Sequence, residues 1–443
     1  MATRKVLALG AGSVARPCVQ YILKKGHHVV CVDTVKENVL RVLGGHPNGT
    51  PVVDDAVANV TGLIREHAPD VLVCLLPTVF MVKIAKACIE AGVPMVGASY
   101  VKDEMRELSA SARERGISIL CEMGVDPGID HMSAVEKIDG LKAAGGIVEG
   151  FWSVCGALPD LGSNTNPFGY KLSWAPASLV GASKRSARII VGGERIDYPD
   201  GATYQHPAFV EIGSLGCFET YANADSLPYI ESYGIPDAKN IYRGTLRYPG
   251  WCELVSAMQK LRLFDEDARD FSRRTHASLI REAVGATDAE KTLAEQVAAY
   301  LGLPVYAAVV AKLEWLGLFE ETPVAPEKGS MMDVVSRRYA EKLQFFPGEK
   351  DLVAMRHRYD VFFPQSGKRQ RITATMVQTG SVDADTAIAR TTGIPMGIGA
   401  HLILAGEVTQ KGVLIPTAKE IYKPALAALA EVGMTFDEKV EDI

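Results

Sequence analysis

Short apolar runs alternate with segments of helical periodicity over the first 120 residues of the chain. The apolar runs are nearly continuous, which is typical of parallel strands buried on both faces. The segments between them repeat apolar residues every three or four positions, as helices that cover a sheet do. The pattern therefore predicts an α/β fold with a doubly wound parallel sheet. We predict strands at 6–9, 29–32, 52–53, 71–76, 95–96 and 118–120, and helices at 14–25, 36–43, 56–67, 79–91 and 102–115.

The texture of the sequence changes after residue 128. A predicted helix at 130–141 precedes strand-like, aromatic and glycine-rich segments, and a helical stretch follows at 252–316. The tail resumes helical patterns at 400–407 and 417–432. We predict a first domain over 1–128, an inserted α+β domain over 129–390, and a C-terminal segment over 391–443 that returns to the first domain.

The sequence GAGSVA at residues 10–15 joins the first predicted strand to the first predicted helix and fits G-x-G-x-x-[G/A]. Gly10 allows a tight turn, Gly12 lets the backbone approach a pyrophosphate, and Ala15 is small enough for close helix packing. Ser13 and Val14 then supply N–H groups at the helix N-terminus, where an anion is favoured. This context predicts a Rossmann domain that binds a dinucleotide.

Asp33, with Thr34 after it, ends the second predicted strand, 21 residues beyond Gly12. An acidic side chain there can accept hydrogen bonds from the adenosine ribose, whereas a 2′-phosphate would meet like charge unless an arginine compensates. The strand end lacks such an arginine, although Lys36 and Arg41 are near in sequence. We therefore expect NAD before NADP.

Further polar and backbone groups follow the ends of the later strands, at the edge where open α/β sheets bind ligands. Ser99 and Tyr100 follow the fifth strand and Asp126 follows the sixth, so their side chains should converge. Asp126 could equally cap the helix that begins near residue 130. The additional cofactor-binding candidates are Asp54, Leu75, Leu76 and Val125.

Composition narrows the range of partners. Lys and Arg total 47 against 53 Asp and Glu, and a net charge of −6 argues against nucleic acid or an anionic membrane. The eight cysteines occur singly, without a C-x-x-C pair, so we expect reduced thiols and no metal site. The apolar stretch 71–82 is too short to span a membrane, and the N-terminal sequence runs directly into a strand without a signal peptide. These features favour a cytoplasmic protein.

Several motifs along the chain resemble glutamate-forming saccharopine dehydrogenase. They are ASY (98–100), MGVDPGIDHM (123–132), NPFGYKLSW (166–174), RGTLRYPGW (243–251), GEKDLVAMRH (348–357), GIPMGIGAHLIL (393–404) and KGVL (411–414). The resemblance covers nearly the whole chain in order. It implies an NAD(P)-dependent oxidoreductase of lysine metabolism that acts on a secondary amine and is a homodimer, with an interface in the second domain.

The implied reaction removes hydride from the carbon next to nitrogen, adds water to the imine, and releases 2-aminoadipate 6-semialdehyde and glutamate. By this resemblance Asp126, Tyr100 and Cys155 lie nearest the reacting carbon, and Asp126 is a candidate acid or base. Saccharopine has several carboxylates, for which bidentate arginine is a suitable partner. The substrate-binding candidates are Ser99, Tyr100, Asp126, Lys171, Trp174, Arg243, Thr245, Leu246 and Arg247.

One position departs from the family pattern. The family usually has Asn-Arg-Asp-Ser where this chain has Ala224 within Asn-Ala-Asp-Ser. That arginine would help to hold a substrate carboxylate, so either Lys184 or Arg185 replaces it or the natural substrate lacks one carboxylate. The alternatives are a related amine-forming reductase of the carboxynorspermidine or opine kind, and a non-catalytic protein that senses NAD(H).

Overall fold

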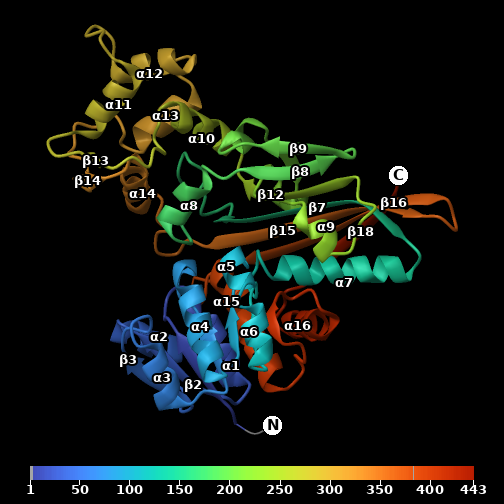
Figure 1. Ribbon diagram of the computed structural model, residues 1–443. Helices are drawn as coiled ribbons and strands as arrows, with labels where there is room; N and C mark the ends of the chain where they lie inside the picture. The colour runs from blue at the N-terminus through green and yellow to red at the C-terminus, as the bar shows by residue number, and fades with distance from the viewer. Residues whose placement is uncertain (1–2, 383) are drawn as a thin grey trace. The chain divides into compact units, whose positions relative to one another are not determined.

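The computed structural model describes residues 3–382 and 384–443 (Figure 1). Backbone contacts divide the chain into two compact units. The first unit holds the chain up to Val148, the short segment Ser232–Ile235, and Asp360–Ile443, whereas the second holds Glu149–Glu231 and Pro236–Tyr359. The domain boundaries expected at residues 128 and 390 stay predictions, because compactness divides the chain differently.

A parallel sheet lies at the centre of the first unit. Its seven strands in the described residues have the order β17-β6-β5-β4-β1-β2-β3, and every neighbouring pair is parallel. Its central strands are fully buried, as their continuous apolar runs predict. The predicted α/β class is confirmed. The strands are β1 (Lys5–Leu9), β2 (His28–Asp33), β3 (Gly49–Val53), β4 (Val71–Cys74), β5 (Met95–Gly97), β6 (Ser118–Leu120) and β17 (Gly412–Leu414).

Helices follow most of these strands, close to their predicted positions. The helix expected at 102–115 is divided into two short helices, α5 (Asp103–Arg106) and α6 (Ser109–Glu114). The remaining helices of the first unit are α1 (Ala15–Lys24), α2 (Lys36–Leu43), α3 (Val60–His67), η1 (Thr78–Phe80), α4 (Met81–Ala91), α7 (Ile129–Ala143), α15 (Ala387–Leu404) and α16 (Lys419–Glu431).

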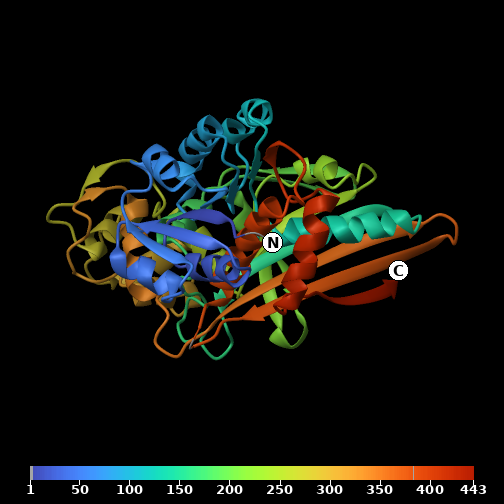
Figure 2. The same cartoon turned by 90° about the horizontal axis from the view of Figure 1, so that it is seen from below.

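The C-terminal segment contributes the seventh strand and the helices α15 and α16. β17 pairs with β6, a pairing that the sequence pattern did not predict. α15 lies against α1, and a Cβ atom added at Gly393 would come within 2.4 Å of the Val14 carbonyl oxygen. Only glycine permits that approach. α16 packs beside α7, where Tyr422 donates a hydrogen bond of 2.6 Å to Asp139 (Figure 2).

A larger mixed sheet has the strand order β10-β11-β12-β7-β15-β16-β18, with β8 paired to β12 and β9 paired to β8. β12 runs parallel to β7, whereas β10, β11 and β12 are successively antiparallel. The strands are β7 (Ile147–Pro159), β8 (Ala187–Val191), β9 (Glu194–Tyr198), β10 (Ala208–Glu211), β11 (Cys217–Ala222), β12 (Asn240–Arg247), β15 (Asp351–Phe363), β16 (Lys368–Thr379) and β18 (Asp437–Asp442).

The helical stretch expected at 252–316 consists of four helices, with the short strand β13 (Arg269–Asp270) between the first two. Figure 1 shows α11 to α14 as a cluster beyond the strands of the second unit. Three of these helices begin with capping boxes, at Thr275, Thr292 and Ser330, so local sequence determines where they start. The helices of this unit are α8 (Pro176–Ala182), η2 (Ala202–Gln205), η3 (Gly213–Leu215), α9 (Pro228–Ser232), α10 (Trp251–Lys260), α11 (His276–Val284), α12 (Leu293–Leu301), α13 (Ala308–Trp315) and α14 (Met331–Lys342), and β14 (Lys328–Gly329) pairs with β13.

Candidate functional site

The glycine loop between β1 and α1 has the geometry that a pyrophosphate requires. Gly10 has a φ of +100°, and a Cβ atom there would lie 3.1 Å from the Leu75 carbonyl oxygen. At Gly12 nothing lies within 4 Å of an added Cβ atom, so the backbone is open on that side. The first turn of α1 contains no acidic residue and its N-cap, Val14, makes no side-chain cap. The N–H groups at this helix end therefore fit a phosphate.

Asp33 at the end of β2 is connected to this loop. Its Oδ2 accepts a hydrogen bond of 2.8 Å from the backbone N–H of Ala11, and its Oδ1 accepts one of 2.9 Å from Val35. Arg41 donates from Nη2 to the carbonyl oxygen of Ala11 at 2.9 Å. A carboxylate and a guanidinium therefore both lie at the loop. The Asp33 carboxylate favours a ribose hydroxyl, whereas the Arg41 guanidinium at the same loop could bind a 2′-phosphate.

The remaining cofactor candidates lie around the same edge of the sheet. Asp54 accepts hydrogen bonds from the Asp55 N–H and from the Asn59 side chain, so part of its capacity serves the local turn. Leu75 pairs with β1 through its N–H, and its backbone faces Gly10. Ser99 Oγ lies 3.0 Å from Thr78 Oγ1. Ser13 and Thr34 are at the surface or partly exposed, Leu76 is partly buried, and Val125 is buried.

Tyr100 and Asp126 are brought together by the ends of β5 and β6. The Tyr100 hydroxyl donates a hydrogen bond of 2.5 Å to Asp126 Oδ1. Tyr100 is 37% exposed, so the pair is open to a ligand. Because parallel strands end at the same edge of a sheet, the two side chains converge as the sequence pattern predicts. A carboxylate held by a phenol in this way can accept a proton from a bound amine or water.

Beneath this pair lies a buried polar network that sequence reasoning missed. Glu122 Oε1 accepts a hydrogen bond of 2.8 Å from the backbone N–H of Val101, the residue after Tyr100. Oε2 of Glu122 lies 2.8 Å from Nε2 of the fully buried His131. Nδ1 of His131 lies 2.6 Å from the hydroxyl of Tyr233, in the short segment that the first unit takes from the middle of the chain. In the sequence, only the histidine of DPGIDH, His131, could have indicated this network.

In the second unit the RGTLR sequence forms the end of β12. Arg247 is buried, and its guanidinium lies 4.8 Å from the ring centroid of Tyr170 and 5.3 Å from that of Trp251. Its Nη1 donates to the Leu246 carbonyl oxygen at 2.8 Å. Its Nε has no hydrogen-bond partner among the described residues. A buried cation with an unused donor fits an anionic ligand group.

The other substrate candidates of this unit have varied surroundings. Arg243 lies 4.3 Å from the ring of Tyr229. Thr245 is paired in register with the buried Cys155 of β7. Lys171 is buried against both carboxylate oxygens of Glu349. Although burial alone would raise the pKa of Glu349, its hydrogen bonds, with that from Lys171 first, lower it. Trp174 donates to the Tyr170 hydroxyl at 2.6 Å, and Leu246 is a fully buried core residue.

The cation beside Ala224 is neither Lys184 nor Arg185, the two residues that the sequence suggested. Lys184 pairs with Glu266 at 2.6 Å, at the surface. Arg188 instead donates from its backbone N–H to the Ala224 carbonyl oxygen at 3.4 Å, and its guanidinium pairs with Asp225. Arg188 is therefore the arginine beside position 224, although it comes from a different strand, β8. Sequence spacing gave no signal for it.

Comparison with known proteins agrees with this geometry. The model of the saccharopine dehydrogenase C-terminal domain matches residues 124–434, and that of the saccharopine dehydrogenase NADP binding domain matches residues 6–120. The chain belongs to the saccharopine dehydrogenase family. The predicted resemblance is thereby confirmed. The match agrees with the predicted nicotinamide dinucleotide cofactor. The matched model names NADP, whereas we expected NAD before NADP.

Members of the saccharopine dehydrogenase family in fungi match over their full length. The chain is 31% identical to the saccharopine dehydrogenase [NADP(+), L-glutamate-forming] of Pyricularia oryzae, over 99% of this chain and 100% of that protein. The apo saccharopine dehydrogenase (L-Glu forming) of Saccharomyces cerevisiae has a TM-score of 0.88 and 27% identity, covering 99% of this chain and 100% of that one. The chain is also 34% identical to the mitochondrial alpha-aminoadipic semialdehyde synthase of Bos taurus. That match covers 98% of this chain but only 47% of the Bos taurus protein.

No helix among residues 3–382 and 384–443 is both long and apolar enough to cross a membrane. No group of three or more His, Cys, Asp or Glu side chains in that part of the chain could hold a metal ion.

Proposed function

We propose that this chain is an NAD(P)-dependent oxidoreductase of the CH–NH bond of saccharopine. The reaction converts saccharopine, water and oxidised cofactor into 2-aminoadipate 6-semialdehyde, glutamate, reduced cofactor and a proton, or runs in reverse. The observation that carries the proposal is the 2.5 Å hydrogen bond between Tyr100 and Asp126 at the ligand edge of a dinucleotide-binding sheet. Full-length similarity to fungal enzymes named for this reaction supports it.

The bound nicotinamide would supply the hydride acceptor, and the residues of the chain would manage protons and position. Asp126 would accept the proton that the secondary amine loses as its neighbouring carbon is oxidised. The Tyr100 hydroxyl donates to Asp126 Oδ1 at 2.5 Å, which orients the carboxylate for this step. The proton from the amine would pass to solvent, which regenerates the carboxylate. Asp126 would then carry both protons of the added water to nitrogen, one as water adds to the imine and one as the carbinolamine collapses. General acid–base steps of this kind are worth about 10²–10⁴-fold in rate.

Arg247 would bind a substrate carboxylate. Its guanidinium is buried between aromatic rings, which fixes its plane, and Nε has a donor without a partner in the described residues. A bidentate contact to a carboxylate would use that donor. Arg243, Lys171 and Trp174 are proposed to line the same substrate site, with Cys155 and the backbone of Thr245 near the reacting carbon.

The cofactor proposed is NAD, with NADP as the alternative. Asp33 favours the free ribose hydroxyls of NAD, because a 2′-phosphate would meet its carboxylate at the loop. Arg41, which donates to the same loop, supports NADP. The proposal for NAD rests on Asp33 alone, whereas the fungal relatives are named as NADP(+) enzymes.

The second candidate function is the same chemistry on another secondary amine, of the carboxynorspermidine or opine kind. The observation that favours it is Ala224, where the family usually has an arginine that holds a carboxylate. Arg188, beside this position, is already paired with Asp225. A substrate carboxylate there would have to compete with Asp225 for the Arg188 guanidinium. We further propose a cytoplasmic homodimer with its interface in the second domain, as the family resemblance implies.

The deciding experiment follows reduced cofactor at 340 nm after L-saccharopine is added with NAD, and in parallel with NADP. Turnover with release of glutamate is the expected result. Binding of NADH without turnover on saccharopine, but with turnover on another secondary amine, would favour the second candidate. Absence of turnover on every secondary amine would contradict both.

A further inference from the structure

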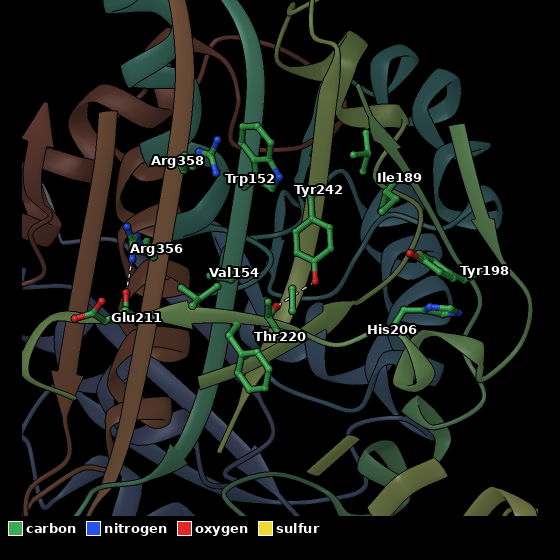
Figure 3. A pocket seen from close by; sticks show the side chains of 14 residues that line it. Trp152, Val154, Ile189, Tyr198, His206, Glu211, Thr220, Tyr242, Arg356 and Arg358 are labelled. Atoms are coloured by element: carbon green, nitrogen blue, oxygen red, sulfur yellow. Dashed lines mark hydrogen bonds between the residues drawn. The ribbon is translucent and has the colours of Figure 1, made fainter. Parts of the chain in front are cut away.

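A cavity of about 430 Å³ lies within the second unit, on the strands β7, β12 and β15 (Figure 3). Its size is within the range of small-molecule sites. In Figure 3, Arg356 and Arg358 come from β15 on one side, Tyr198 and His206 lie on the other, and Tyr242 stands between them. No step of the proposed reaction uses any of these residues.

The cavity is on the opposite face of the sheet from two of the candidate site residues, Cys155 and Thr245. Trp152 and Val154 line it, whereas Cys155 does not. On β12 the lining residue is Tyr242, which pairs in register with Trp152, and Thr245 pairs with Cys155. Since successive side chains of a strand point to opposite faces, Thr245 and Cys155 face away from the cavity.

The same alternation holds on β15. Arg356 and Arg358 line the cavity, and the residue between them, His357, is fully buried on the other face. The ring of His357 lies 5.7 Å from that of Phe151, a residue of β7 that likewise does not line the cavity. The cavity therefore lies on the other face of this sheet from Cys155, Thr245 and His357.

The lining combines flat rings with guanidinium groups. The Arg358 guanidinium lies 4.0 Å from the ring centroid of Trp152. Stacking on an aromatic ring fixes the plane of a guanidinium. Arg356 donates to the carbonyl oxygen of Glu211, which holds it at the same wall. The cavity thus has two arginines against one glutamate among its lining residues.

The opposite wall is aromatic. The rings of Tyr198 and His206 lie 5.1 Å apart, and Phe209 at the rim is 64% exposed. The Tyr242 and Thr220 hydroxyls lie 3.2 Å apart at the floor. Burial raises the pKa of Tyr242, so its phenol remains a protonated donor at neutral pH. Flat apolar surfaces beside cationic and hydroxyl donors match a flat ligand that ends in an anionic group.

We propose that this cavity is a second ligand site, which binds a small planar apolar anion such as an aromatic carboxylate. The rings bury the flat body of the ligand, and the arginine wall binds its carboxylate. A neutral molecule of the same shape lacks the charge-assisted contact and binds more weakly. The site needs no turnover, so it is independent of the proposed function.

The test uses the full chain and two matched probes, 2-naphthoate and the neutral 2-naphthol, in calorimetric titrations. One 2-naphthoate binds per chain, and 2-naphthol binds at least about tenfold more weakly, as expected for a lost charge-assisted contact. Arg358→Gln weakens 2-naphthoate binding at least about tenfold and leaves 2-naphthol unchanged. Arg337→Gln, at an exposed arginine of α14, changes neither. Saturating saccharopine does not displace the probe.

A rim variant keeps the test valid if Arg358→Gln fails to fold. Phe209→Ala, at an exposed position, weakens binding of both probes by about threefold through loss of ring contact. Equal affinity for the two probes, displacement by saccharopine, or no binding of 2-naphthoate near about 1 mM would overturn the proposal. So would light scattering that shows a dimer which Phe209→Ala dissociates, because a second copy of the chain would then occupy this face.

Discussion

Nε2 of His131 lies 2.8 Å from Oε2 of Glu122 in the interior of the first unit, where their side chains are 0% and 7% exposed. Burial of such groups costs desolvation energy, so the pair contributes little net stability. Glu122 also has a φ of +58°, a strained value for a residue other than glycine. What the pair provides is position, because Glu122 binds the N–H of Val101, next to Tyr100.

Glu122→Gln should therefore lower kcat more than it changes KM. The amide can still accept a hydrogen bond from Val101 but replaces the carboxylate oxygen that contacts His131, which lets the Tyr100 loop shift. Misplacement by about 1 Å costs about 10²-fold in rate. Steady-state kinetics with saccharopine measure the effect. Tyr233→Phe removes the hydroxyl that contacts His131 and should also lower kcat. An unchanged kcat in a less stable protein would assign Glu122 a merely structural role.

Asp126→Asn should lower kcat by about 10²–10⁴-fold, because the amide cannot accept the amine proton. Tyr100→Phe should have a smaller effect, since it removes only the hydroxyl that holds Asp126 Oδ1 at 2.5 Å. Cofactor binding, measured by NADH fluorescence, should be nearly unchanged in both variants. If Asp126→Asn keeps full kcat while its melting temperature falls, Asp126 is a structural residue of the loop.

Arg247→Lys should raise KM for saccharopine. A lysine keeps the charge but cannot make the bidentate contact, and it fits poorly between the rings of Tyr170 and Trp251. The loss of a charge-assisted hydrogen bond is about 1.5–3 kcal/mol, which is roughly 10- to 150-fold in kcat/KM. Arg337→Gln is the control for an exposed arginine. An unaffected KM in a folded Arg247→Lys protein would remove this residue from the substrate site.

Ala224→Arg should lower KM for saccharopine if a substrate carboxylate lies near this position. The added guanidinium would restore one charge-assisted contact, worth about 1.5–3 kcal/mol. Arg188 beside it is engaged with Asp225, so the matched variant Arg188→Gln tests whether it already serves the same purpose. Should Arg188→Gln raise KM while Ala224→Arg does not lower it, Arg188 is the substituting cation. No change in either would mean that position 224 does not face the substrate.

The parallel sheet could be predicted because its strands are short continuous apolar runs and its helices have clear periodicity. Its seventh strand could not, because Gly412–Leu414 joins the sheet only through pairing with β6, far away in sequence. The glycine loop, Tyr100 and Asp126 could be located because each follows a strand of known direction. Glu122 and Arg188 could not, since their importance depends on partners from other elements.

A second histidine pair should make the stability of the first unit depend on pH. Nε2 of His27 lies 3.0 Å from Nδ1 of His401, where α15 meets the end of α1. Burial lowers the pKa of both rings. The pKa of His27 is lowered further by His401 and Arg4, whereas Asp70 raises it. Lys25 lowers the pKa of His401 further. Two imidazoles in contact share a hydrogen bond only while at least one is neutral.

The direction of this pH dependence follows from proton uptake. Because the folded pKa values lie below 6.5, the unfolded chain binds protons first as the pH falls. Stability is therefore complete above pH 6.5 and decreases as the pH falls toward the folded pKa values, by up to about 1.4 kcal/mol per pH unit for each proton. Urea unfolding of the His27→Gln/His401→Gln protein between about pH 7 and pH 5 should show a shallower dependence than the parent. Identical slopes in the parent and the double variant would mean that other groups govern the acid sensitivity.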